Sequence, residues 1–192
     1  DLNTYNISEE QILKKITKNT KAILPVHLFG NPVNVEVLKK NINNDSIKIV
    51  EDCAQSFGSG INHQRAGSIG DMGCFSFYPT KNLGCYGDGG MVTTNSEELF
   101  NMIIKLRNHG SSKRYHHDII GYNSRLDEIQ AAILNVKMKH IDRFNLMRQK
   151  IAALYNANLS DLDFITIPEI IENGNHVYHQ YTINSKIREK IK

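Results

Sequence analysis

Short apolar runs alternate with amphipathic segments along most of this chain, and that alternation constrains the fold more than any other feature of the sequence. Runs with the length of buried strands occupy residues 22–26, 47–50, 74–77, 91–94 and 177–183. Segments with a helix-capping signal or a helical apolar spacing occupy residues 8–16, 35–40, 96–107 and 125–154. Strands that alternate with helices predict an α/β domain with a mostly parallel or mixed sheet flanked by helices.

The last helical segment carries the longest pattern. Its face is formed by Leu126, Ile129, Ile133, Val136, His140, Phe144, Met147, Ile151 and Leu154. Steps of three and four sustained over this length predict one long helix with a single buried stripe. The polar segment before it, residues 108–123, has no clear period, and loops of that length are commonly functional.

Composition excludes several classes of protein. The hydrophobic fraction of 40% is ordinary for a globular domain, and no apolar run approaches the roughly 20 residues that span a bilayer. The net charge of +3 is mild and the lysines are spread out, which argues against a nucleic-acid partner. Cys53, Cys74 and Cys85 form no C-x-x-C pair, so we expect neither a disulfide framework nor a zinc ribbon, and a cytoplasmic location.

The two ends of the chain suggest a piece of a longer protein. The chain begins with Asp1 in turn-like sequence and ends inside the charged run 186–192, just after an apolar stretch. We therefore expect parts of the fold on both sides of this segment to be missing.

Ligands of α/β sheets gather at the carboxyl ends of the strands, where three candidate residues fall. Asp52 follows the strand predicted at 47–50, Ser76 lies near the end of the next strand, and Lys81 comes just past it. A loop lysine is usually a solvated charge, but it also suits covalent attachment of a carbonyl cofactor. A carboxylate like Asp52 caps helices or turns, and it also pairs with the pyridine nitrogen of pyridoxal phosphate (PLP).

Three further polar residues are equally ambiguous when taken alone. Gln55 fits an ordinary turn or a contact with a cofactor ring. Ser76 fits a bond to neighbouring backbone or to a phosphate. Asn123 fits a helix cap or a phosphate donor near a helix start. The glycine run 84–90 matches neither the dinucleotide nor the P-loop pattern, and the adjacent pair His116 and His117 lacks further spaced ligands, so no metal site is predicted.

Several segments together carry a resemblance to a known family. They are residues 20–30, 50–58, 70–83, 87–90, 107–110 and 121–132, including the runs Val50-Glu51-Asp52-Cys53-Ala54-Gln55 and Phe75-Ser76-Phe77-Tyr78-Pro79-Thr80-Lys81-Asn82. In this order they resemble the DegT/DnrJ/StrS family of nucleotide-sugar aminotransferases, which has the aspartate-aminotransferase-like (fold type I) architecture. The resemblance extends from about residue 4 to residue 183.

The resemblance implies a role for each candidate residue. Lys81 is the lysine that bonds to PLP and then moves the substrate proton, and Asp52 pairs with the pyridinium nitrogen. Gln55 contacts the ring or its phenolic oxygen, and Ser76 binds the phosphate. Asn123 matches an asparagine that reaches the cofactor phosphate of a neighbouring subunit, which implies a homodimer with shared active sites.

The same resemblance implies the reaction and the domain organisation. The family transfers an amino group, usually from glutamate, to a nucleotide-linked keto-sugar. Residues 1–145 correspond to part of the large PLP-binding domain with the start of the linking helix, and residues 146–192 to the end of that helix and the beginning of a small α+β domain. Two alternatives stay open: a PLP-dependent sugar dehydratase, in which a histidine replaces the lysine, and a non-catalytic regulator with the same fold.

Overall fold

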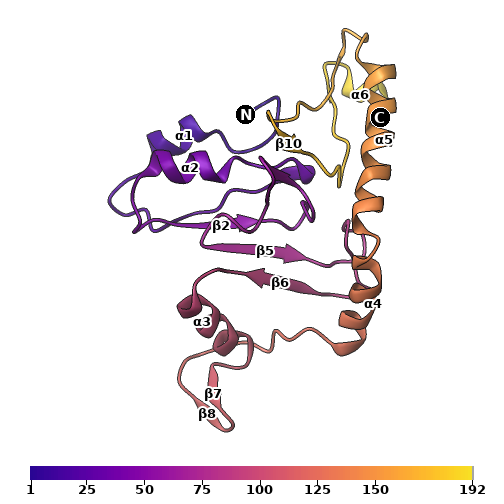
Figure 1. Cartoon of the computed structure of the whole chain (residues 1–192). Coiled ribbons are helices and arrows are strands. Elements are labelled where there is room, and N and C mark those ends of the chain that lie inside the picture. The colour runs from indigo at the N-terminus through magenta and orange to yellow at the C-terminus, as the bar shows by residue number, and fades with distance from the viewer. Residues whose placement is uncertain (192) are drawn as a thin grey trace.

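The computed structural model describes residues 1–191 (Figure 1). Its centre is a four-stranded sheet of order β1-β2-β5-β6, formed by β1 (Ala22–Ile23), β2 (Lys48–Asp52), β5 (Met72–Ser76) and β6 (Gly90–Thr93). β1, β2 and β5 run parallel, and β6 pairs antiparallel with β5. The predicted α/β class and mixed, partly parallel sheet are therefore confirmed.

Two short helices cover the sheet near β1 and β2. α1 (Glu9–Lys15) begins at Ser8, whose hydroxyl accepts a hydrogen bond from the backbone N–H of Gln11, as the capping signal predicts. α2 (Val35–Ile42) packs beside α1. A core cluster lies between these helices and the strands; it consists of Ile12, Ile23, Val33, Val35, Leu38, Ile47 and Ile49. This core anchors β1 and β2, and β2 ends at the candidate site.

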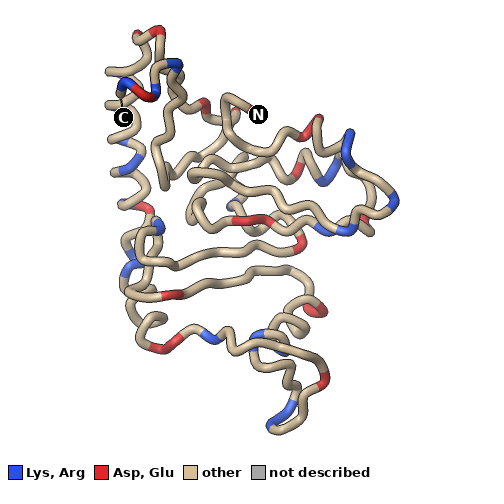
Figure 2. Tube along the Cα trace, turned by 180° about the vertical axis from the view of Figure 1, so that it is seen from behind, with Lys and Arg blue, Asp and Glu red and all other residues tan. Residues whose placement is uncertain are grey.

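The remaining elements extend the chain on both sides of the sheet. α3 (Glu97–Arg107) follows β6 and leads to the hairpin of β7 (Ser111–Lys113) and β8 (His116–His117). β3 (Gly60–Ile61) pairs with β4 (Gln64–Arg65) and β10 (Gly174–Asn175), and β9 (Ile165–Thr166) pairs with β11 (Asn184–Ser185). α6 (Arg188–Ile191) ends the described chain, in which Lys and Arg are interspersed with Asp and Glu (Figure 2).

The prediction of one long helix with a buried apolar stripe is wrong. The segment forms two helices, α4 (Glu128–Met138) and α5 (Ile141–Leu159), and much of the expected stripe is exposed, with Ile129 at 73% and Leu154 at 66%. The buried positions are instead Leu134, Ile141, Asn145 and Ala152. The face formed by these buried residues packs on the loop after β5. The periodicity therefore identified an apolar face of the helices, but the described chain covers a different face.

The strand predicted over residues 177–183 is also absent from the described residues. The segment is held by separate bonds instead, from Val177 N–H to the Gly30 carbonyl and from Gln180 N–H to the Phe29 carbonyl. Among residues 1–191, no helix combines the length and the apolarity that crossing a bilayer requires.

Candidate active site

The candidate site lies where β2 and β5 end side by side. Asp52, the last residue of β2, pairs in register with Cys74, and Ser76 ends β5 two residues later. One oxygen of Asp52 accepts a hydrogen bond from the backbone N–H of Ala54 at 3.0 Å. The described residues give its other oxygen no hydrogen bond, so half of this carboxylate is available to a ligand.

Gln55 is fixed by a backbone donor. Its side-chain oxygen accepts a hydrogen bond from the Phe29 N–H at 2.6 Å. Phe29 lies in the 3-10 turn η1 (Leu28–Gly30) and has a φ of 57°, and the next residue, Gly30, has a φ of 96°. Because the carbonyl oxygen of the amide is engaged, its NH₂ group is the part that remains free to donate a hydrogen bond.

Ser76 ends β5, and Lys81 lies on the turn that follows this strand. The Ser76 hydroxyl oxygen accepts a hydrogen bond from the Tyr78 N–H at 3.3 Å, and the Lys81 N–H donates to the Tyr78 carbonyl at 2.9 Å. Lys81 is half-buried, and no described residue forms a hydrogen bond or ion pair with its amine. The hydroxyl proton of Ser76 and the amine of Lys81 are therefore both available.

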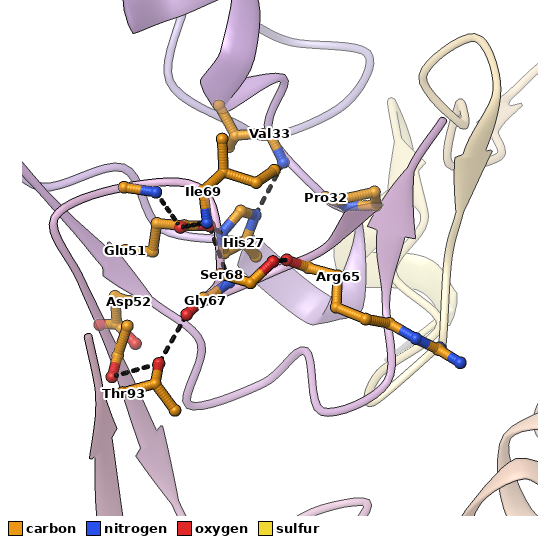
Figure 3. Close-up of polar contacts among 12 residues, drawn as sticks. His27, Pro32, Val33, Glu51, Asp52, Arg65, Gly67, Ser68, Ile69 and Thr93 are labelled. Atoms are coloured by element: carbon orange, nitrogen blue, oxygen red, sulfur yellow. Dashed lines mark hydrogen bonds and ion pairs between the residues drawn. The ribbon is translucent and has the colours of Figure 1, made fainter. Parts of the chain in front are cut away.

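A buried pair supports the end of β2 (Figure 3). His27 Nε2 and a Glu51 oxygen lie 2.9 Å apart, and both side chains are inaccessible to solvent. The Val33 N–H donates to His27 Nδ1 at 2.8 Å, so Nε2 carries the ring proton and donates it to Glu51. Three backbone N–H groups complete the shell of the carboxylate, those of Gly67, Ile69 and Gly70.

These contacts set the charge of Glu51. Burial opposes ionisation, but hydrogen bonds from His27, Gly70 and Gly67 outweigh it, and the pKa of Glu51 lies below its ordinary value. Glu51 also clusters with His27 and Cys53. The cluster does not suit a cation: four donors already occupy the carboxylate, Val33 occupies the free imidazole nitrogen, and burial raises the pKa of the Cys53 thiol.

His179 is a site residue that the sequence analysis did not single out. Its Nδ1 is buried and has no hydrogen-bond partner among the described residues. Burial, followed by the positive charges of Lys81 and Arg148, lowers the pKa of His179 to about 4, so the imidazole is neutral at pH 7. The sequence placed His179 in an apolar strand, but it gave no signal that this segment passes beside Lys81.

Asn123 does not join the other candidates within this chain. It is exposed, pairs with Asn108 in an isolated bridge, and accepts a hydrogen bond from Arg125 Nε at 3.3 Å. Figure 1 places the connection between β8 and α4 on the opposite side of β6 from β2. His116 and His117 are exposed on the β7–β8 hairpin in the same region.

The chemistry of the clustered groups fits PLP. An unpaired carboxylate oxygen on Asp52 suits a protonated ring nitrogen, and the free amine of Lys81 suits an aldehyde. The Ser76 hydroxyl and the Gln55 NH₂ are donors for a phosphate and a phenolic oxygen. Each predicted role except that of Asn123 thus corresponds to a group that the described residues leave available.

Comparison with known proteins identifies the family of the chain. The model of the DegT/DnrJ/EryC1/StrS aminotransferase family matches residues 1–192. The chain is 48% identical over 188 residues to a UDP-N-acetyl-3-dehydro-alpha-D-glucosamine 3-aminotransferase of Acidithiobacillus ferrooxidans, covering 98% of the chain and 51% of that protein. It is 43% identical over 190 residues to a pleiotropic regulatory protein of Geobacillus stearothermophilus, covering 98% and 51%.

Solved structures show the same fold. The chain is similar to DesV of S. venezuelae, with a TM-score of 0.95 and 38% identity, over all of this chain and 52% of that one. It is also similar to an E. coli GDP-4-keto-6-deoxy-D-mannose-3-dehydratase with bound hydrated PLP, with a TM-score of 0.91 and 28% identity, over 100% and 55%. The chain spans about half the length of the curated relatives it matches. By its sequence and its fold, the chain belongs to the DegT/DnrJ/EryC1/StrS aminotransferase family.

Proposed function

We propose that the full-length protein is a PLP-dependent aminotransferase that transfers an amino group from glutamate to a nucleotide-linked keto-sugar. The observation that carries this proposal is that Asp52 and Ser76 lie at the adjacent ends of β2 and β5, that the turn bearing Lys81 follows β5, and that each of the three has an unengaged polar group. The sugar aminotransferases among the relatives support the class of substrate.

Each residue has one task in this proposal. Bound PLP supplies an electron-withdrawing ring that stabilises negative charge on the substrate carbon. Asp52 accepts a hydrogen bond from the ring nitrogen and keeps it protonated, and Ser76 donates to the phosphate. Gln55 donates its NH₂ to the phenolic oxygen, because its carbonyl is held by Phe29. Lys81 binds the cofactor and, once its amine is released, carries the proton to and from the substrate carbon.

A sugar dehydratase is the second candidate, because a dehydratase that binds PLP shares this fold. Lys81 favours amino transfer, since the dehydratases that the sequence resembles carry histidine at this position. A regulator is the third candidate, supported by the name of one relative. The presence of Lys81, Asp52 and Ser76 together favours a catalytic protein over a regulator.

We also propose the placement of this chain in the complete molecule. Residues 1–145 belong to the large PLP-binding domain. Residues 146–192 belong to the end of the linking helix, which is α5 in the structure, and to the start of the small domain. Asn123 serves the cofactor phosphate of a second copy in a homodimer. Asn123 is exposed, and the connection that carries it lies on the other side of β6 from β2 (Figure 1). Both facts support a role in the active site of a second copy and not in the site of its own chain.

The two halves of the reaction test the proposal separately. We would add glutamate to the PLP-loaded full-length protein and follow the cofactor spectrum and the release of 2-oxoglutarate, then add UDP- or dTDP-linked keto-sugars. Amino transfer predicts that glutamate converts the cofactor and that one sugar restores it while gaining nitrogen. A deoxygenated sugar without nitrogen would support the dehydratase, and no response to any substrate would support the regulator.

A further inference from the structure

The residue that follows Lys81 makes the longest-range contacts of the turn. Asn82 is 8% exposed, and its NH₂ group donates to the carbonyl of Val177 at 2.9 Å and to the side-chain oxygen of Asn145 at 2.8 Å. Asn145, on α5, is 5% exposed and donates its own NH₂ to the carbonyl of Phe57 at 3.0 Å. Two buried amides thus join the Lys81 turn to α5, to the segment beside His179 and to the turn that follows Gln55.

The orientation of both amides is fixed by their partners. The NH₂ group of Asn82 faces two acceptors, the Val177 carbonyl and the Asn145 side-chain oxygen, and the NH₂ group of Asn145 faces the Phe57 carbonyl, so the bond between the amides runs from Asn82 to Asn145. Asn145 lies on the face of α5 that buries Ile141 and Ala152. A polar side chain in such a place is costly unless it is hydrogen-bonded, so the three hydrogen bonds offset part of the cost of burying these amides. The side-chain oxygen of Asn82 is buried and has no hydrogen-bond partner among the described residues.

Two glycines allow the close approach that the amide pair needs. Gly58 has a φ of +90°, and a Cβ there would lie 2.6 Å from the Asn145 nitrogen. Gly30 has a φ of +96°, and a Cβ there would lie 2.9 Å from a methyl group of Val177. Both positions combine a conformation that favours glycine with a contact that excludes a side chain. Glycine at position 58 therefore leaves room for the Asn145 amide, and glycine at position 30 leaves room for the side chain of Val177, whose carbonyl accepts the bond from Asn82.

Two other hydrogen bonds close to Lys81 are local, whereas the Lys137 ammonium on α4 donates to the Gly84 carbonyl at 2.6 Å. The Lys81 N–H bonds to Tyr78, and the Cys85 N–H bonds to Phe77, both within the same loop. Asn82, in contrast, connects the loop to Asn145 and Val177, which are 63 and 95 positions away in the sequence. Asn82 is therefore the residue next to Lys81 through which the turn bonds to α5 and to the segment that leads to His179.

We propose that Asn82 and Asn145 are positioning residues for Lys81. The pair would hold the Lys81 turn in the place from which the amine could react with the aldehyde of bound PLP, a role that rests on the proposed function. Loss of the pair lets the turn shift. A displacement of about 1 Å is enough to slow a reaction between two held groups by about a hundredfold.

The decisive variant is Asn82→Asp, which keeps the size of the side chain and replaces the donor by an oxygen that faces two carbonyl oxygens. We would mix the cofactor-free full-length protein with PLP, reduce samples with borohydride at intervals, and measure by peptide mass the rate at which the cofactor becomes fixed to Lys81. The rate should fall between about ten- and a hundredfold. Asn158→Asp is the control, because Asn158 is exposed on α5 and bonds only to the Leu154 carbonyl.

A second comparison separates positioning from a general loss of stability. Leu38, 1% exposed in the core between α1 and α2, does not contact the Lys81 turn, so Leu38→Ala should destabilise the protein without slowing attachment in the folded state. If Asn82→Asp does not fold, Asn145→Ala should still slow attachment severalfold, since it removes the bonds to Asn82 and to the Phe57 carbonyl but keeps the bond from Asn82 to Val177. Attachment at the wild-type rate in these Asn variants, or equal slowing by Leu38→Ala, would overturn the positioning role alone. Failure of the wild type to attach PLP at Lys81 would overturn the proposed function as well.

Discussion

His27 and Glu51, 24 residues apart in the sequence, form a hydrogen bond of 2.9 Å between two side chains that solvent does not reach. The bond connects the segment after β1 to β2, one residue before Asp52. Glu51 also accepts hydrogen bonds from the backbone of residues 67–70, which lead into β5. One buried carboxylate therefore fixes the strand ends from which the candidate site is built.

The first prediction concerns the charge of Glu51. Glu51→Gln keeps the size of the side chain but replaces one acceptor oxygen by a donor that faces an N–H group. We expect the free energy of unfolding to fall by about 3 kcal/mol, since bonds to a buried charged group are lost and a backbone donor is left unpaired. Urea titration measures the change. Glu172→Gln, in an exposed loop, is the matched control, and an equal effect of both substitutions would contradict the role of Glu51.

The second prediction concerns stability at acid pH. Burial is the main cause that lowers the pKa of His176 to about 4, against roughly 6.5 in the unfolded chain. Between these values the unfolded state binds more protons, so this contribution to stability is complete above pH 6.5 and is lost as the pH falls towards 4. Folding also lowers the pKa of Glu51, so Glu51 contributes a further loss of stability at lower pH. This loss begins as the pH falls below the pKa of Glu51 in the unfolded chain and is complete below its pKa in the folded protein.

The variant His176→Asn tests this pH dependence. Its side-chain oxygen can replace Nδ1 as the acceptor for the Tyr178 N–H, but it does not titrate. We expect a shallower decline of stability between pH 6.5 and 4 than in the wild type, whatever the change at pH 7. The same substitution at His116, which is exposed, should leave the slope unchanged. A wild-type slope in His176→Asn would show that this ring does not cause the decline.

The third prediction concerns Asp52. In Asp52→Asn the full-length protein should still bind PLP, because Ser76, Gln55 and Lys81 are unchanged. The half-reaction with glutamate should slow by about two orders of magnitude or more, since the ring nitrogen loses the charge that keeps it protonated. Stopped-flow spectroscopy of the cofactor measures this rate. A rate equal to that of the wild type would remove the proposed role.

The fourth prediction concerns Asn123 and a shared site. Inactive variants at Asn123 and at Lys81, mixed and allowed to exchange subunits, should regain activity, because the mixed dimer contains one site with both residues intact. At full exchange, roughly a quarter of all sites are complete by simple statistics if each site draws one residue from each copy. Persistent inactivity after mass spectrometry has confirmed exchange would place Asn123 outside the partner's site.

The sequence predicted those parts of the site that depend on local pattern. Asp52, Ser76 and Lys81 lie at strand ends that hydrophobic runs reveal, and Ser8 caps α1 as expected. The pairing of His27 with Glu51 was not predictable in this way, because it depends on contacts between separate segments. The same holds for the approach of His179 to Lys81.

The face of α5 illustrates a second limit of sequence patterns. A stripe of apolar residues from Ile129 to Leu154 predicted the buried side, yet the described chain covers the side that carries Asn145. Periodicity reveals that a helix has two faces, whereas the neighbouring segments decide which one is buried. A buried asparagine breaks the apolar pattern, and its role becomes evident only when Asn82 and the Phe57 carbonyl lie beside it.

The most direct test of the central claim is the covalent anchor of the cofactor. We would incubate the full-length protein with PLP, reduce it with borohydride and locate the pyridoxyl group by peptide mass, with Lys81→Ala and the exposed Lys139→Ala in parallel. The account predicts one dominant adduct on Lys81, absent from Lys81→Ala and unchanged in Lys139→Ala. Binding of PLP without an adduct, or an adduct on another lysine, would contradict the assignment of Lys81 and the aminotransferase mechanism built on it.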